Sequence, residues 1–167
     1  MTAIVELKNA TKIVTNGFDE EKIILNDVSL DIYEHDFITI LGGNGAGKST
    51  LFNSIAGTLP LTSGSIRIMG EDVTNVSPEK RAKYLSRVFQ DPKMGTSPRM
   101  TVAENLLIAK FRGERRGLVP RRLSSYREEF QNTINKIGNG LEKHLDTPIE
   151  FLSGGQRQAL SLLMATL

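Results

Sequence analysis

A glycine-rich segment, Gly42–Thr50, has residue types at a spacing that suits phosphate binding. It contains the pattern G-x-x-x-x-G-K-[ST], counted from Gly42, after an apolar stretch and before a helical pattern. Glycines allow a tight turn that brings backbone N–H groups against phosphate oxygens, and the following helix N-terminus adds partial positive charge. Lys48 is predicted to reach the β- and γ-phosphates, and the Ser49 hydroxyl to ligate Mg²⁺. The predicted phosphate-binding residues are Gly42, Gly43, Asn44, Gly45, Ala46, Gly47, Lys48, Ser49 and Thr50.

A second candidate anion site begins at Ser153, where two glycines open the last helical pattern. The segment Leu152-Ser153-Gly154-Gly155-Gln156 fits a capping box, in which Ser153 and Gln156 satisfy each other's backbone N–H groups. Two glycines in a first helical turn cost about 1 kcal/mol each relative to alanine, so a simple cap does not favour them. Close approach of a ligand to the backbone does. We therefore predict that Ser153, Gly154, Gly155 and Gln156 bind an anion at a helix N-terminus.

The patterns around the phosphate loop predict an α/β core with a mixed sheet. Phe37–Leu41 is almost entirely apolar, which is typical of a parallel strand buried on both faces, and it leads into the loop. Val28–Ile32 alternates apolar and polar residues, as in an antiparallel strand, and Asn16-Gly17 predicts a hairpin turn before it. A helix is predicted over Gly47–Ala56, with Gly57 after its C-terminus. Further strands are predicted at Ile4–Lys8, Ser65–Gly70 and Leu85–Phe89.

Beyond about residue 90 the strand patterns stop and helical patterns dominate. Thr101 and Glu104 form a capping box at the start of one helix, a second is predicted over Ser124–Ile137, and a third begins near Ser153. We therefore predict two parts. Residues 1–90 form the core that carries the phosphate loop, and residues 91–167 form a helical subdomain.

Composition and charge exclude several classes of protein. The 167 residues include no cysteine, which excludes disulfides and thiolate metal sites. The formal net charge of +2 gives no argument for nucleic acid, and no apolar run approaches the ~20 residues that span a bilayer. The first residues lack the basic start and apolar core of a signal peptide, and His35 and His144 have no metal-ligand spacing.

One segment, from Lys110 to Arg127, carries a strong local charge. It holds seven basic residues and a single acidic one, Glu114. The segment is either a solvated linker or a surface for a transmembrane partner or anionic lipid headgroups. Nucleic acid is disfavoured, because only Phe111 and Tyr126 interleave the charges as aromatic residues.

Three features in order, the phosphate loop, a glutamine at Gln90 and the segment Leu152–Gln158, resemble the ATP-binding subunits of ABC transporters. The resemblance implies a P-loop NTPase core with a helical subdomain, and ATP and Mg²⁺ as cofactors. It assigns catalytic roles to Lys48 and Gln90, whose side chains would act on the γ-phosphate and on the attacking water. It assigns Mg²⁺ binding to Ser49 and Gln90.

The same resemblance implies an ATPase that works as a head-to-tail homodimer. Ser153, Gly154 and Gly155 of one subunit would contact the γ-phosphate bound to the other. Separate transmembrane permease subunits are the implied partners, and the implied place is cytoplasmic, peripheral on the inner face of the cell membrane. Two alternatives stay open: a soluble ABC-class ATPase in translation or DNA repair, and a nucleotide-binding fragment that does not hydrolyse ATP.

The chain departs from the family pattern at two places. The aromatic residue that stacks on adenine in the family falls near Val14, which is not aromatic, and Phe18 is the alternative. The family's strand ending in Asp-Glu, its D-loop and its switch histidine do not occur in the 167 residues, and the pattern Leu160–Leu167 runs to the last residue. We expect that the C-terminal part of the core is missing, and that the chain alone does not hydrolyse ATP.

Overall fold

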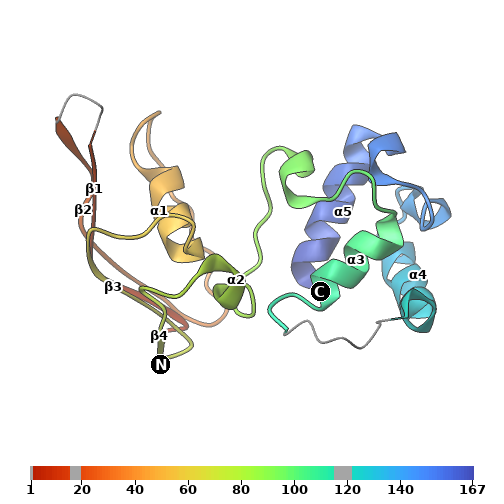
Figure 1. The fold of residues 1–167 in the computed structure, drawn as a ribbon, viewed down its shortest axis with the longest axis horizontal. Helices are drawn as coiled ribbons and strands as arrows, with labels where there is room; N and C mark the ends of the chain where they lie inside the picture. Colours follow the sequence, from red (N-terminus) through yellow and green to blue (C-terminus); the bar gives the residue numbers. More distant parts are fainter. Residues whose placement is uncertain (1, 16–19, 115–121) are drawn as a thin grey trace. The chain divides into compact units, whose positions relative to one another are not determined.

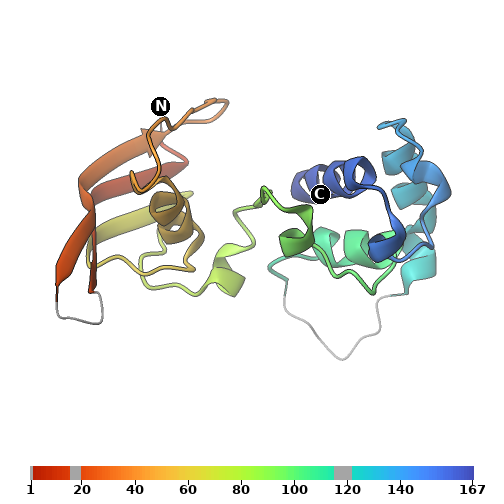
Figure 2. The same cartoon turned by 90° about the horizontal axis from the view of Figure 1, so that it is seen from above.

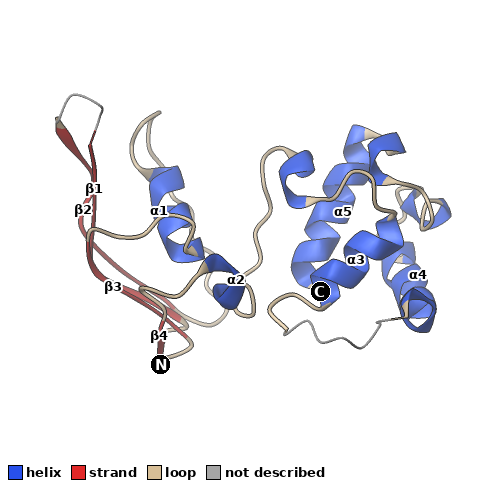
Figure 3. Ribbon diagram, in the orientation of Figure 1, coloured by secondary structure: helices blue, strands red, loops and turns tan. Residues whose placement is uncertain are grey.

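The computed structural model describes residues 2–15, 20–114 and 122–167, which divide into two compact units. The N-terminal unit is Met1–Leu85 and the C-terminal unit is Ser86–Leu167. Among the described residues the strands all belong to the N-terminal unit, and the C-terminal unit is helical (Figure 1, Figure 3). The predicted Asn16-Gly17 turn, Phe18 and residues 115–121 of the basic segment lie outside the described residues.

The N-terminal unit is built on a four-stranded antiparallel sheet of order β2-β1-β3-β4. One helix, α1, lies against a face of this sheet (Figure 2) and buries Leu51 in a core that includes Leu7, Leu25 and Ile66. The strands predicted from alternating patterns and the helix after the phosphate loop are confirmed. The elements are β1 (Val5–Thr15), β2 (Glu21–Ile32), α1 (Lys48–Ala56), β3 (Ser63–Ile68), β4 (Glu71–Asp72) and α2 (Pro78–Arg81).

The register of β1 with β2 shifts between Leu7 and Ala10. Asn9 and Asp27 both have left-handed backbones, with φ of 50° and 51°. The Asn9 side-chain amide donates to Asp27 Oδ1 at 2.7 Å, and the Asp27 N–H donates to Thr11 Oγ1 at 3.1 Å. Gly64 of β3 passes so close that an added Cβ would lie 2.3 Å from Asn9 O. Local side-chain hydrogen bonds therefore stabilise the chain where the register shifts.

Two predicted strands are not formed in the structure. Residues 37–41 and 85–89 have no strand structure, so the part of the predicted sheet built on them is wrong for the described chain. Phe37 is 95% exposed and Leu41 is 86% exposed, although an apolar run predicts burial. A strand requires a neighbour for its backbone N–H and C=O groups, and within the described ranges no strand lies beside either segment. Local apolar composition alone is insufficient to form the strand.

The C-terminal unit packs its helices around one apolar cluster. Leu106, Phe130, Ile134 and Leu160 are fully buried in it. The predicted helix starts at Thr101 and Ser153 are confirmed, and the helix predicted over 124–137 is divided into a 3₁₀ turn and an α-helix. The elements are η1 (Pro92–Gly95), α3 (Val102–Lys110), η2 (Leu123–Tyr126), α4 (Arg127–Asn135), η3 (Leu141–Lys143), η4 (Ile149–Phe151) and α5 (Gly154–Thr166).

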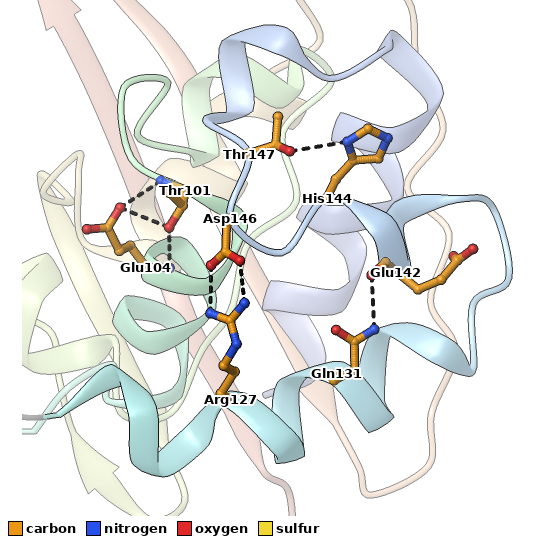
Figure 4. A network of polar contacts seen from close by, with 8 residues as sticks. All are labelled: Thr101, Glu104, Arg127, Gln131, Glu142, His144, Asp146 and Thr147. Atoms are coloured by element: carbon orange, nitrogen blue, oxygen red, sulfur yellow. Dashed lines mark hydrogen bonds and ion pairs between the residues drawn. The ribbon is translucent and has the colours of Figure 1, made fainter.

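Polar contacts join the elements of this unit (Figure 4). Arg127 at the start of α4 forms a bidentate ion pair with Asp146. Its Nη1 donates to Oδ1 at 2.6 Å, and its Nη2 donates to Oδ2. Gln131 donates from Nε2 to the Glu142 carbonyl at 3.0 Å. α4 is thus attached at two points to the segment that leads into the last helix.

No helix in the described ranges combines the length and the apolar character needed to cross a membrane.

Candidate functional site

The phosphate loop is fixed by two glycines that no other residue could replace without strain. Gly45 and Gly47 have φ of 82° and 84°, in the left-handed region that L side chains rarely adopt. An added Cβ at Gly47 would also lie 2.8 Å from the Ile24 carbonyl of β2. Because the loop passes this close to the sheet, the start of α1 is held against β2.

The N-terminus of α1 is open to an anion. Gly47 occupies the N-cap position without a side-chain hydrogen bond, and the first turn holds no acidic residue. The first intrahelical bond is from the Leu51 N–H to the Gly47 carbonyl, at 2.9 Å. The N–H groups of Lys48, Ser49 and Thr50 therefore have no intrahelical partner, and the helix dipole is uncompensated there.

The Lys48 side chain folds over the loop that precedes it. Its Nζ donates to Gly42 O at 2.6 Å and to Gly43 O at 2.7 Å. These two carbonyls hold the ammonium group against the start of the loop. Residues 42–46 and Ser49 are exposed, whereas Lys48 and Thr50 are half-buried and Gly47 is buried.

The described residues offer too few side-chain ligands to enclose a metal ion with protein groups alone. Ser49 is exposed in the first turn of α1 and offers one hydroxyl. Within the described parts of the chain, no group of three His, Cys, Asp or Glu side chains could hold a metal ion. Mg²⁺ commonly takes one or two protein ligands and completes its shell with phosphate oxygens and water.

Ser153 caps α5 through the predicted reciprocal box. Its Oγ accepts from the Gln156 N–H at 3.3 Å, and its N–H donates to Gln156 Oε1 at 3.0 Å. Gly154 and Gly155 are exposed, and an added Cβ at either position would meet nothing within 4 Å. Within the described residues, packing therefore gives no reason for glycine at these two positions.

Gln90 does not end a strand. It is exposed and follows the extended stretch 86–89, in which the Arg87 guanidinium lies 4.7 Å from the centre of the Phe89 ring. Asp91 directly after it caps η1, where Oδ1 accepts from the Lys93 N–H at 3.0 Å. Gln90 belongs to the C-terminal unit together with Ser153–Gln156, whereas the phosphate loop belongs to the N-terminal unit.

The candidate residue for adenine stacking is described only in part. Val14 lies near the end of β1 with 37% of its surface exposed, which leaves an apolar face for a base. The alternative, Phe18, lies outside the described residues.

The sequence patterns did not point to two polar side chains that are buried in the structure. Arg81, 2% exposed, donates to carbonyls at the end of α1, and Asn105, 1% exposed, bonds four backbone atoms of the segment 97–101. A basic residue in the last turn of a short helix looks like ordinary dipole compensation in sequence. Asn105 is weakly indicated by the sequence, because asparagine is unfavourable inside a helix unless its side chain makes specific hydrogen bonds.

Comparison with known proteins gives the same family that the sequence motifs resemble. A family model for ABC transporters matches residues 25–167. The tyrosine transport ATP-binding protein of Clostridioides difficile (strain R20291) is 40% identical over 164 residues, which cover 98% of this chain and 65% of the relative. The spermidine/putrescine import ATP-binding protein of Haemophilus ducreyi is 38% identical, over 97% of this chain and 39% of that protein.

Solved structures give the same result. The dimeric structure of a bacterial ABC transporter cassette superposes with a TM-score of 0.76 at 28% identity, over 96% of this chain and 68% of that chain. A dimeric cassette in a post-hydrolysis state bound to ADP and Pi gives a TM-score of 0.72 at 27% identity. The chain spans 65% of the first relative above and 39% of the second.

Proposed function

Because the chain belongs to the ABC transporter ATP-binding family, we propose that it binds ATP at Gly42–Thr50 as part of a transporter's ATPase subunit. The observation that carries the proposal is the Lys48 ammonium group, held by the Gly42 and Gly43 carbonyls beside the uncapped N-terminus of α1. A polyanion is the ligand that this combination of a cation and free N–H groups would attract.

Lys48, Ser49 and Gln90 are the residues that we assign to the chemistry. Lys48 would compensate charge on the β- and γ-phosphates, and the Ser49 hydroxyl would ligate Mg²⁺ together with phosphate oxygens. When bound, the metal ion would neutralise charge that develops on the phosphates. Gln90 would orient the water at the γ-phosphate, and its side chain is exposed.

The Ser153–Gln156 turn is proposed to bind the γ-phosphate of a second subunit, in a head-to-tail pair. Support comes from the open space around Gly154 and Gly155 and from the dimeric state named for two similar cassettes. The pair would act on separate transmembrane permease subunits at the cytoplasmic face of the membrane. ATP binding would close the pair and hydrolysis would open it.

The sharpest test of ATP binding is Lys48→Ala measured against ATP and AMP. Removing the ammonium group should weaken ATP binding at least about tenfold, because charge-assisted hydrogen bonds to the phosphates are lost. AMP binding should change little, since Lys48 is assigned to the β- and γ-phosphates. Isothermal titration of wild-type chain, Lys48→Ala and the exposed-lysine control Lys136→Ala measures this.

The outcome that contradicts the assignment is equal loss of ATP and AMP affinity, or no loss of either. The Lys136→Ala control should behave as wild type, because Lys136 lies after α4 in the other unit. Mg²⁺-dependent turnover by the 167-residue chain, abolished by Lys48→Ala, would overturn the expectation that the chain alone is inactive.

A further inference from the structure

Arg81 is a buried cation, and its hydrogen bonds within the described residues all go to backbone carbonyls. Its Nη1 donates to Ser54 O and Ile55 O, both at 2.8 Å, at the C-terminus of α1. Its Nε donates to Val76 O at 2.9 Å, and its Nη2 donates to Thr74 O at 3.0 Å. The guanidinium thus joins the end of α1 to the segment 74–76.

The last carbonyls of a helix have no intrahelical partners and carry the negative end of the helix dipole, so a cation there is favourable. Burial lowers the pKa of Arg81, and the nearby Asp72 carboxylate raises it. The guanidinium compensates the dipole at one end of α1, while the other end stays open for an anion.

The absence of a side chain at Gly57 leaves room for the Arg81 guanidinium. Gly57 ends α1 with φ of 82°, and its N–H donates to Ser54 O at 3.1 Å. An added Cβ at this position would lie 2.8 Å from Arg81 Nε and 3.0 Å from Arg81 Cζ. The glycine therefore serves two purposes, the left-handed turn and the room for the guanidinium plane against it.

We propose that Arg81 is a positioning residue for the phosphate loop, acting through the far end of α1. The helix has nine residues, about 13 Å in length, and is rigid over that distance. Its N-terminus is located by the contact of Gly47 with Ile24, and its C-terminus by the four bonds of Arg81. Release of the second contact would let α1 pivot and would displace Lys48 and the loop N–H groups. The proposal rests on the ATP-binding role assigned to the loop.

Two variants test the contact from its two sides. Arg81→Lys keeps the charge but replaces the fork with a single ammonium group, and Gly57→Ala pushes a methyl group into the guanidinium. Each should weaken ATP binding by the 167-residue chain about fivefold with unchanged stoichiometry. Amide hydrogen exchange at residues 48–51 should become faster in both. Isothermal titration gives the affinity and the stoichiometry.

Ser29→Ala is the matched control. It removes the Oγ acceptor of the Asn9 N–H, a 3.0 Å bond in the same unit, but it leaves the four carbonyls that Arg81 uses. It should lower the melting temperature and leave the ATP affinity of the folded chain unchanged.

The readouts separate positioning from mere stability. If Arg81→Lys and Gly57→Ala lower the melting temperature or the stoichiometry while affinity and exchange at 48–51 stay as in wild type, the proposal is overturned. The same holds if Ser29→Ala weakens ATP binding as much as they do. If Lys48→Ala binds ATP like wild type, the assigned function fails instead, and hydrogen exchange still reports whether Arg81 controls the loop.

Discussion

At the scale of single residues, the candidate sites depend more on backbone than on side chains. Most of the phosphate loop and the Ser153–Gly155 turn is exposed, and the groups offered to an anion are helix N–H groups. The loop has one cationic side chain, Lys48, and the Gly42 and Gly43 carbonyls hold its ammonium group in place. Changes that close the backbone to a ligand should therefore matter as much as changes of charge.

Gly154→Asp tests whether the second site faces a phosphate group. A carboxylate at the first helical position should repel the partner's γ-phosphate and block ATP-driven dimerisation, with nucleotide binding to the monomer nearly intact. The measurement is size-exclusion chromatography with ATP, on the protein extended to the length of its relatives and unable to hydrolyse ATP. Asn132→Asp on α4 adds the same charge elsewhere and should dimerise normally. Equal dimer formation by Gly154→Asp and wild type would remove this turn from the interface.

Ser54 gives a prediction about stability. Its hydroxyl is buried in α1 with no hydrogen-bond partner in the described chain. Ser54→Ala should raise the free energy of unfolding by about 1 kcal/mol, because an unsatisfied polar group is removed and alanine is the better helix former. Ser29→Ala is the opposite case, since Ser29 Oγ accepts from the Asn9 N–H at 3.0 Å, and it should lose about 1 kcal/mol. Urea denaturation that shows a loss for both would contradict this reading of Ser54.

At the scale of elements, predictability follows the range of the interactions that form each element. The helix starts at Thr101 and Ser153 were predictable, because a capping box is complete within four residues. The phosphate loop was also predictable, since its glycines encode local backbone angles. The strands expected at 37–41 and 85–89 were not, because a strand is completed by residues distant in sequence. The role of Arg81 was not predictable for the same reason, since its partners at Ser54 and Ile55 lie in another helix.

The ion pair that attaches α4 predicts an acid-sensitive C-terminal unit. The hydrogen bond from Arg127 lowers the pKa of the Asp146 carboxyl below its ordinary value. The pair therefore stabilises the fold above the ordinary pKa of aspartate, and this contribution is lost as the pH falls through the lowered value. Melting curves from neutral to acidic pH should show a smaller acid-induced loss for Asp146→Asn than for wild type.

The matching variant is Arg127→Gln, which removes the other partner of the same pair. It should reduce the acid sensitivity to the same extent, and the double variant should add nothing further. If Asp146→Asn keeps the full acid-induced loss of wild type, other carboxylates carry it and the Arg127 contact is irrelevant to pH.

At the scale of the whole molecule, exposed apolar surface just before the phosphate loop favours self-association. Phe37, Ile38 and Leu41 are 95%, 42% and 86% exposed, and their backbone is not part of the sheet. Exposed apolar side chains beside unpaired backbone groups favour association with other chains. The 167-residue chain should self-associate at micromolar concentration, as measured by light scattering.

A double variant, Phe37→Ser with Leu41→Ser, should reduce this association, because it removes apolar surface without touching a packed contact. Ile23 on β2, 55% exposed, offers the control, since Ile23→Ser alters exposed apolar surface within a paired strand. A monodisperse, cooperatively melting wild-type monomer would show that residues 37–41 are not the surface through which chains meet.

The strand order also has a consequence for synthesis on the ribosome. β1 pairs with β3 as well as with β2, for example Val5 with Ile68, and the phosphate loop and α1 lie between β2 and β3 in the chain. The hairpin of β1 and β2 can form early, but the long-range pairing waits until β3 has left the exit tunnel. Arg81 emerges later still. A nascent chain therefore displays its phosphate loop before β3 and Arg81 are available to support it. If the loop binds ATP as proposed, ATP would also stabilise the folded form of that nascent chain.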